Sequence, residues 1–230
     1  MTENPRQNVS FASNAHEAHG YLALPPSGRG PGLIVIQEWW GLTSHIADLV
    51  DRFAREGFVA LAPDLYGGRT THDAEEAGRL MQELPAERAA ADLAGAVDFL
   101  VSHEAVTTEK VGAVGFCMGG GFVLSLAAQE GERVGAAVPF YGVLQAETDW
   151  SGLRARVQGH YGEQDAFVPA DAVRAQFDAI EAATGTRPEL HFYPAGHAFL
   201  NDENLLGTYD PDQAGIAWGR AVGFLHSVLG

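Results

Sequence analysis

The sequence predicts an α/β protein with a mainly parallel, twisted sheet and helices on both faces. Its strand candidates are continuous apolar runs, such as 33–36 and 111–116, rather than the alternating pattern of a half-exposed sheet. Such runs are typical of parallel strands that are buried on both faces. Amphipathic segments of helical period separate the runs along the chain, and this alternation is typical of a layered α/β architecture.

The first elements lie on either side of a Pro/Gly-rich connection at 25–32. Weak alternation over 8–24 predicts an antiparallel hairpin at a sheet edge. After the first buried run comes a helix, which Thr43 or Ser44 can cap and which ends at Gly57. Its apolar positions have the i, i+3, i+4, i+7 spacing of one helix face: Ile46, Leu49, Val50 and Phe53.

Strands and helices then alternate to the end of the chain. The predicted strands lie at 58–61, 111–116, 134–140, 157–161 and 190–193. The predicted helices lie at 73–83, at 86–103, from about 119, at 170–183 and from Pro211 onward. Functional sites of parallel sheets gather at the carboxyl ends of the strands, so the loops after these strands are the places to expect chemistry.

Length and composition predict a single globular domain over residues 1–230. The chain of 230 residues is within reach of one hydrophobic core, and its 46% hydrophobic content excludes intrinsic disorder. Lysine and arginine number 14 against 30 aspartates and glutamates, which gives a net charge of −16. A polyanionic surface repels phosphate backbones and anionic lipids, so nucleic-acid and membrane partners are not expected.

The single cysteine, Cys117, excludes an internal disulfide. The N-terminus lacks the charged and apolar regions of a secretory signal, so a cytoplasmic location is expected. The uncharged stretch 111–129 contains five glycines and is better explained as strand, tight turn and helix than as a membrane span. The nine histidines show no metal-ligand spacing such as H-E-x-x-H, and no metal site is predicted.

A glycine-rich turn at 115–119 follows a predicted strand and begins a predicted helix. This is the context of a nucleophile elbow, with Cys117 where serine is usual. Small residues two positions on either side let the chain turn sharply, and a helix N-terminus favours a thiolate. The alternative is an inert, buried cysteine that packs as a small apolar side chain.

An acid and a histidine follow the cysteine in the order that such an elbow requires. Asp165 comes after the strand predicted at 157–161, and His197 comes after the strand predicted at 190–193. Taken alone, Asp165 is typical of a turn or cap residue and His197 of a loop histidine. Their order and their places at strand ends instead predict a triad with Cys117.

Four segments together resemble the dienelactone hydrolase family: Gln37-Glu38-Trp39-Trp40-Gly41, 115–120, Asp165 and Gly196-His197-Ala198-Phe199. The resemblance covers nearly the whole chain and implies an α/β-hydrolase fold. It implies a carboxylic ester or lactone hydrolase of the carboxymethylenebutenolidase type that needs no cofactor. By the same resemblance, Cys117 is the nucleophile, His197 is the base and Asp165 orients it. The family's glutamate that matches Glu38 pairs with the resting cysteine and helps to deliver a thiolate.

The segment around Glu38 also has a physical rationale. A carboxylate at the end of a buried strand, beside Trp39 and Trp40, needs a polar partner, and backbone amides are the alternative to the cysteine. The oxyanion hole is expected to consist of two backbone N–H groups, those of Trp39 and Met118.

Three aromatic side chains are candidates for a small apolar pocket, with core packing as the alternative: Trp40, Tyr141 and Phe199. The resembled family has an arginine four residues after the histidine, where it holds a substrate carboxylate. Asn201 stands at that position here, which argues against dienelactone itself as the substrate. Arg79 either matches the family's other carboxylate-binding arginine or is a solvated surface residue.

Two other functions are open. A cysteine amidase also places a cysteine on an α/β fold beside a glutamate, although the order of Asp165 and then His197 favours an esterase. A hydrolase-like binding protein without turnover is the alternative outside the enzymes, and the complete set of catalytic residue types argues against it. Each function has a small molecule as its partner, and the protein is expected to be a monomer or a homodimer.

Overall fold

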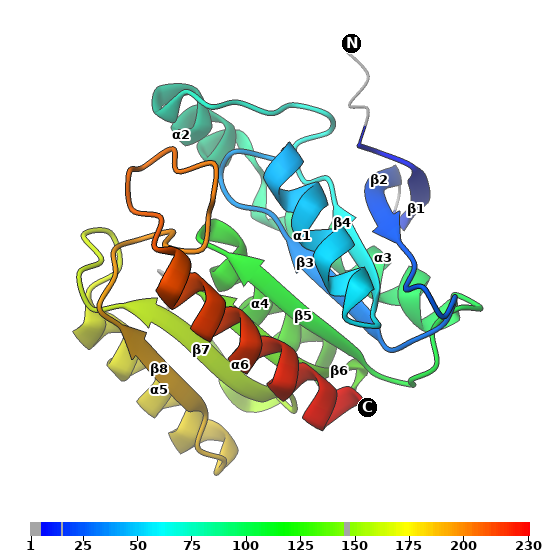
Figure 1. Ribbon diagram of the computed structural model, residues 1–230. Helices are drawn as coiled ribbons and strands as arrows, with labels where there is room; N and C mark the ends of the chain where they lie inside the picture. Colours follow the sequence, from blue (N-terminus) through cyan, green and yellow to red (C-terminus); the bar gives the residue numbers. More distant parts are fainter. Residues whose placement is uncertain (1–5, 15, 145–147) are drawn as a thin grey trace. The chain divides into compact units, whose positions relative to one another are not determined.

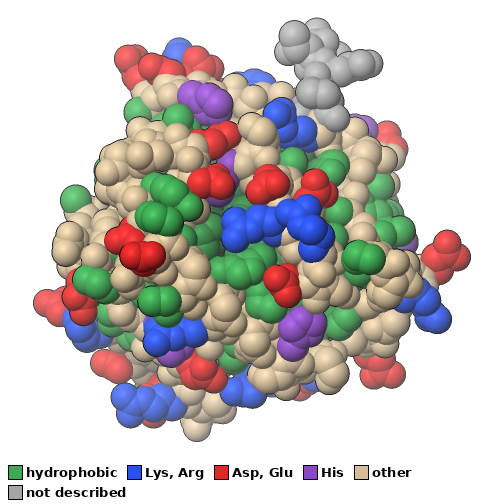
Figure 2. Space-filling model, in the orientation of Figure 1, with side chains coloured by type: hydrophobic (Ala, Val, Ile, Leu, Met, Phe, Trp, Pro, Cys, Tyr) green, Lys and Arg blue, Asp and Glu red, His purple; other side chains and the backbone are tan. Residues whose placement is uncertain are grey.

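A computed structural model describes residues 6–14, 16–144 and 148–230. The chain divides into two compact units, residues 1–111 and 112–230, and each is described by itself (Figure 1). The single domain expected over 1–230 stays a prediction. Acidic side chains are spread over the face drawn in Figure 2, as the net charge of −16 leads one to expect.

The first unit contains the N-terminal hairpin and two further strands. Its strands have the order β1-β2-β4-β3, so the hairpin formed by β1 and β2 lies at the edge of the sheet, as predicted. β1 pairs antiparallel with β2, β2 pairs antiparallel with β4, and β4 pairs parallel with β3. The four strands are β1 (Val9–Ser13), β2 (His16–Ala23), β3 (Gly32–Ile36) and β4 (Val59–Pro63).

Three helices belong to the first unit: α1 (Ser44–Arg55), α2 (Ala74–Glu83) and α3 (Ala86–Ser102). α1 and α3 cover opposite faces of the strands of this unit (Figure 1). The predicted apolar stripe of α1 is buried, and Thr43 is its N-cap residue but makes no side-chain capping bond. The α2 N-cap, Asp73, does accept a bond from the backbone N–H of Glu76.

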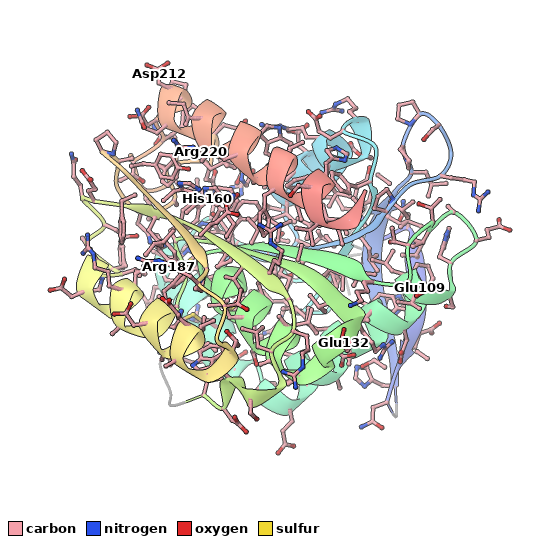
Figure 3. The ribbon with its side chains drawn as sticks, turned by 90° about the horizontal axis from the view of Figure 1, so that it is seen from below. Glu109, Glu132, His160, Arg187, Asp212 and Arg220 are labelled. Carbon is pink, nitrogen blue, oxygen red and sulfur yellow. The ribbon has the colours of Figure 1, made fainter. Side chains whose placement is uncertain are left out.

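The second unit contains strands in the order β5-β6-β7-β8, with the β6·β7 and β7·β8 pairs parallel. α4 and α5 lie on one face of these strands and α6 lies on the other (Figures 1 and 3). The strands are β5 (Val111–Phe116), β6 (Val134–Phe140), β7 (Arg156–Gly162) and β8 (Glu189–Tyr193). The helices are α4 (Met118–Glu130), α5 (Ala170–Thr184) and α6 (Pro211–Leu229), with short 3-10 turns η1 (Gly131–Arg133) and η2 (Trp150–Gly152).

Every predicted helix and strand is present, and the differences are at the ends. The strand predicted at 58–61 instead runs over Val59–Pro63, because its last residues pair with β2, where Pro63 lies opposite Gly20. α6 begins at Pro211 as predicted, and the Asp210 carboxylate accepts bonds from two backbone N–H groups of its first turn. Among the residues that the structure describes, no helix is long and apolar enough to cross a membrane.

Candidate active site

Cys117 lies at a sharp turn between β5 and α4. Its φ is 54° and its ψ is −118°, a conformation that side chains with a Cβ rarely adopt. The backbone N–H of Cys117 donates to the Phe140 carbonyl at the end of β6 (3.0 Å), which fixes the turn. The thiol-bearing residue is half-buried and stands directly before the first turn of a helix.

Two glycines make this turn possible. A Cβ on Gly115 would lie 2.3 Å from the carbonyl oxygen of Gly119, and a Cβ on Gly142 would lie 2.0 Å from that of Cys117. No side chain fits at either distance, so both positions require glycine. Gly115 belongs to the predicted elbow, whereas Gly142 could not be recognised from the sequence because it approaches Cys117 from the loop after β6.

Asp165 and His197 lie in the loops after β7 and β8 and form a hydrogen bond. The distance from His197 Nδ1 to Asp165 Oδ2 is 2.7 Å, and the side chains are 6% and 1% exposed, respectively. The other carboxylate oxygen of Asp165 accepts the backbone N–H groups of Phe167 (2.8 Å) and Val168 (2.9 Å). Both oxygens of the buried carboxylate are therefore satisfied, and one of them fixes the orientation of the imidazole.

Burial lowers the pKa of His197, but its hydrogen bond to Asp165 and the interaction with Cys117, together with the charges of both groups, outweigh burial and raise the pKa from 6.5 to about 10. A raised pKa means that the imidazolium is the stable form at neutral pH. The structure thus brings His197 and Asp165 together within the second unit, the same unit that contains Cys117.

The loop of His197 is held from behind by Thr208. The hydroxyl of Thr208 donates to the backbone carbonyl of His197 at 2.5 Å. Ala198, the residue after His197, has a φ of 56°. The carbonyl of Phe199 accepts a hydrogen bond from the backbone N–H of Asp210 (3.0 Å), which is a second bond across this loop. Sequence reasoning missed Thr208, because nothing in its local sequence shows which carbonyl a threonine in a loop will bind.

Tyr141 packs against the imidazole and Phe199 packs against Tyr141, and neither aromatic side chain is exposed. The ring centroid of Tyr141 is 5.2 Å from that of His197 and 5.6 Å from that of Phe199. Phe167 contacts the imidazole as well, with centroids 5.1 Å apart, but is 62% exposed. The sequence offered one signal for Phe167, a large apolar residue two positions after the predicted acid.

Asn201 is buried in a turn. Its backbone N–H donates to the Ala198 carbonyl (2.9 Å), and its side-chain oxygen accepts the N–H of Glu203 (2.9 Å). The residue at the place of the resembled family's arginine is therefore a neutral part of the loop, with 3% of its surface exposed.

The remaining predicted site residues belong to the first unit. Glu38 and Trp40 are buried after the end of β3, and the Trp40 ring packs edge-on against Trp39, with centroids 4.8 Å apart. The half-buried Trp39 has its backbone N–H in this same connection. The N–H of Met118, the other expected oxyanion donor, is in the second unit at the first residue of α4.

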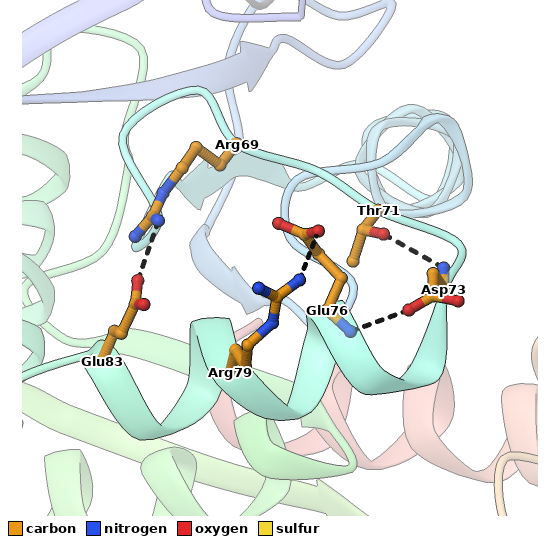
Figure 4. Close-up of polar contacts among 6 residues, drawn as sticks. All are labelled: Arg69, Thr71, Asp73, Glu76, Arg79 and Glu83. Carbon is orange, nitrogen blue, oxygen red and sulfur yellow. Dashed lines mark hydrogen bonds and ion pairs between the residues drawn. The ribbon is translucent and has the colours of Figure 1, made fainter.

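Arg79 lies on the outer face of α2. Its side chain is 62% exposed and pairs with Glu76 one turn earlier at 3.0 Å (Figure 4). Arg69 pairs in the same way with Glu83 at 2.9 Å. Both guanidinium groups of this segment therefore have a carboxylate partner. Among the described residues, no group of three or more His, Cys, Asp or Glu side chains is placed to hold a metal ion.

Comparison with known proteins gives consistent matches. The model of the dienelactone hydrolase family matches residues 18–229. Protein usf of Aquifex pyrophilus is 37% identical, over 97% of this chain and 99% of that protein. A provisionally named carboxymethylenebutenolidase of Aquifex aeolicus is 34% identical, over 97% of this chain and 99% of that protein. The crystal structure of a provisionally named dienelactone hydrolase of Klebsiella pneumoniae matches with a TM-score of 0.84 at 30% identity, over 95% and 96% of the two chains. The predicted α/β-hydrolase fold is confirmed by this match.

Proposed function

Because the chain belongs to the dienelactone hydrolase family, we propose that it hydrolyses carboxylic esters or lactones, with Cys117 as the nucleophile. The observation that supports this assignment best is the 2.7 Å hydrogen bond between His197 and the buried Asp165, with Cys117 acting on the same imidazole. A thiol beside a histidine that a buried carboxylate orients has the arrangement of an activated nucleophile.

In the first half of the reaction, the Cys117 thiolate attacks the acyl carbon and a tetrahedral intermediate forms. The N–H groups of Met118 and Trp39 would stabilise its oxyanion. When the intermediate collapses, the carbon–oxygen bond to the alcohol breaks, and the alcohol oxygen takes the proton from His197. The products are a thioester on Cys117 and the free alcohol.

In the second half, neutral His197 accepts a proton from water as the water oxygen attacks the thioester. Collapse of this second intermediate breaks the carbon–sulfur bond. The acid leaves, and the thiolate–imidazolium pair is restored. Asp165 keeps Nδ1 of His197 occupied in both halves, so that the other ring nitrogen exchanges the proton. These steps need no cofactor.

Glu38 is assigned to the resting enzyme. A carboxylate with 1% exposure is stable only beside hydrogen-bond donors. We assign it the Cys117 thiol as partner after product has left, and binding of the next substrate releases this thiol to His197, which forms the reactive thiolate–imidazolium pair. The small-molecule substrate, the cytoplasmic location and the state as monomer or homodimer belong to the same proposal.

The test is thiol-dependent hydrolysis of 4-nitrophenyl acetate and of a small enol-lactone. Wild-type turnover should be abolished by iodoacetamide and by Cys117→Ala. Full activity of Cys117→Ala would overturn the assignment. Binding of esters without any hydrolysis would favour the binding-protein alternative, and faster turnover of amides than of esters would favour the amidase.

A further inference from the structure

Phe167 places an exposed aromatic surface directly beside the catalytic histidine of the proposed mechanism. Its side chain is 62% exposed, although its ring centroid is 5.1 Å from that of His197. Tyr141, which also contacts His197, is fully buried, and so is Phe199, which contacts Tyr141. Phe167 is therefore the ring of this group that a bound molecule can cover, and covering apolar surface is favourable.

The position of Phe167 is fixed by the acid of the proposed triad. The backbone N–H of Phe167 donates to Oδ1 of Asp165. The other carboxylate oxygen of Asp165, Oδ2, is hydrogen-bonded to His197. The next residue, Val168, donates to the same oxygen and is buried, and α5 begins two residues later. The backbone below the ring is thus ordered before a substrate arrives, which reduces the entropic cost of binding.

The described loops that follow β6, β7 and β8 contain no lysine or arginine in residues 141–144, 148–149, 163–169 and 194–210. Their one cation is the imidazolium of His197, which Asp165 already pairs. They also contain several further carboxylates: Asp149, Glu163, Asp202, Glu203 and Asp210. Asn201 is neutral and buried in its own turn. Such a field disfavours an anionic ligand.

We propose that the site selects uncharged esters whose alcohol portion contains an aromatic group that lies against Phe167, and that it discriminates against esters bearing a carboxylate. The inference rests on the proposed function. The alcohol portion is assigned to Phe167 because His197, which the ring contacts, protonates the departing oxygen in that mechanism. Phe167 is then a residue that determines specificity rather than one that takes part in bond breaking.

The test compares kcat/KM for three acetates: phenyl acetate, 2,2,2-trifluoroethyl acetate and 4-carboxyphenyl acetate. Phe167→Ala should lower kcat/KM about tenfold for phenyl acetate and less than about twofold for the trifluoroethyl ester, as expected from lost apolar contact. For phenyl acetate, the kcat/KM of Phe167→Leu should lie between those of Phe167→Ala and the wild type. Val101→Ala, which trims exposed apolar surface on α3, is the matched control and should leave all three values unchanged.

Discrimination against esters that bear a carboxylate is tested with the wild-type enzyme alone. The 4-carboxyphenyl ester should react about tenfold or more slowly than phenyl acetate at low salt, and the gap should narrow as salt screens the carboxylates. Equal effects of Phe167→Ala on the aromatic and trifluoroethyl esters, or equal rates for the charged and neutral aromatic esters, would overturn the proposal. If no ester is hydrolysed in a Cys117-dependent way, the proposed function fails instead.

Discussion

Two buried histidines of the second unit have opposite charge states, and the comparison shows what burial alone does. His197 is flanked by a carboxylate and a thiol, and its pKa is raised to about 10. His160, in the middle of β7, is fully buried (Figure 3). Its Nδ1 lies 2.8 Å from the Tyr193 hydroxyl, and its Nε2 lies 3.0 Å from Oε1 of Gln158. Burial, followed by the influence of His191 and Arg220, lowers the pKa of His160 well below its ordinary value.

Partner chemistry, not depth, decides which histidine is charged. His160 has a hydroxyl and an amide as partners, and Arg220 of α6 donates to the same Tyr193 hydroxyl at 3.3 Å. Neutral partners and a nearby cation leave burial uncompensated, so this imidazole is neutral. His197 is nearly as buried, but Asp165 supplies a negative charge at 2.7 Å. One histidine is therefore suited to proton transfer and the other to holding strands together.

The largest effect is expected when the carboxylate is removed from the charged histidine. Asp165→Asn keeps the shape but loses the charge, and the amide can stabilise the wrong tautomer of His197. We expect kcat for 4-nitrophenyl acetate to fall by about 10³-fold or more. Glu163→Gln, which removes an exposed carboxylate from the same loop, is the matched control. An Asp165→Asn enzyme within about tenfold of wild type would contradict the role of the charge.

The charge states themselves can be read from the ring-proton shifts of the two histidines in an NMR titration. Because the pKa of His197 is raised from 6.5 to about 10, its imidazolium should persist through neutral pH and be lost only as the pH rises toward 10. His160 should show no protonation at pH 6.5, since its pKa is lowered. In Asp165→Asn, the His197 transition should move to lower pH. Coincident titration of both rings near their ordinary pKa would refute the comparison.

The neutral histidine should matter for stability instead of rate. Tyr193→Phe removes the hydroxyl that bonds His160 and Arg220, and leaves a buried ring nitrogen without its partner. We expect a loss of about 1–3 kcal/mol in the free energy of unfolding, measured with urea. The value of kcat at 25 °C should change little, because the site of Cys117 is intact. A large loss of kcat with unchanged stability would show that the network serves the reaction.

The sequence was sufficient for features that depend on chain order. Continuous apolar runs predicted the strands, and the places of Asp165 and His197 at strand ends predicted that these two side chains meet. The network of His160 could not be predicted, because it depends on register: His160 lies opposite His191, so Tyr193 comes two residues farther along β8, on the same face of the sheet. The exact ends of strands also depend on pairing between strands. β4 continues to Pro63 because this residue lies opposite Gly20 of β2, and the local sequence does not show that pairing.

The smallest effect concerns the backbone that presents His197. Thr208→Val keeps the volume of the side chain but removes the hydroxyl that donates to the His197 carbonyl. A single neutral hydrogen bond of this kind is worth about 0.5–1.5 kcal/mol, so we expect a similar loss of stability. Because the bond holds the loop and not the imidazole, kcat should fall about threefold to tenfold, with KM nearly unchanged. Thr208→Ser, which keeps the hydroxyl, should restore kcat. If Thr208→Val leaves kcat unchanged while Thr208→Ser lowers it, the methyl contacts, and not the hydrogen bond, position the histidine.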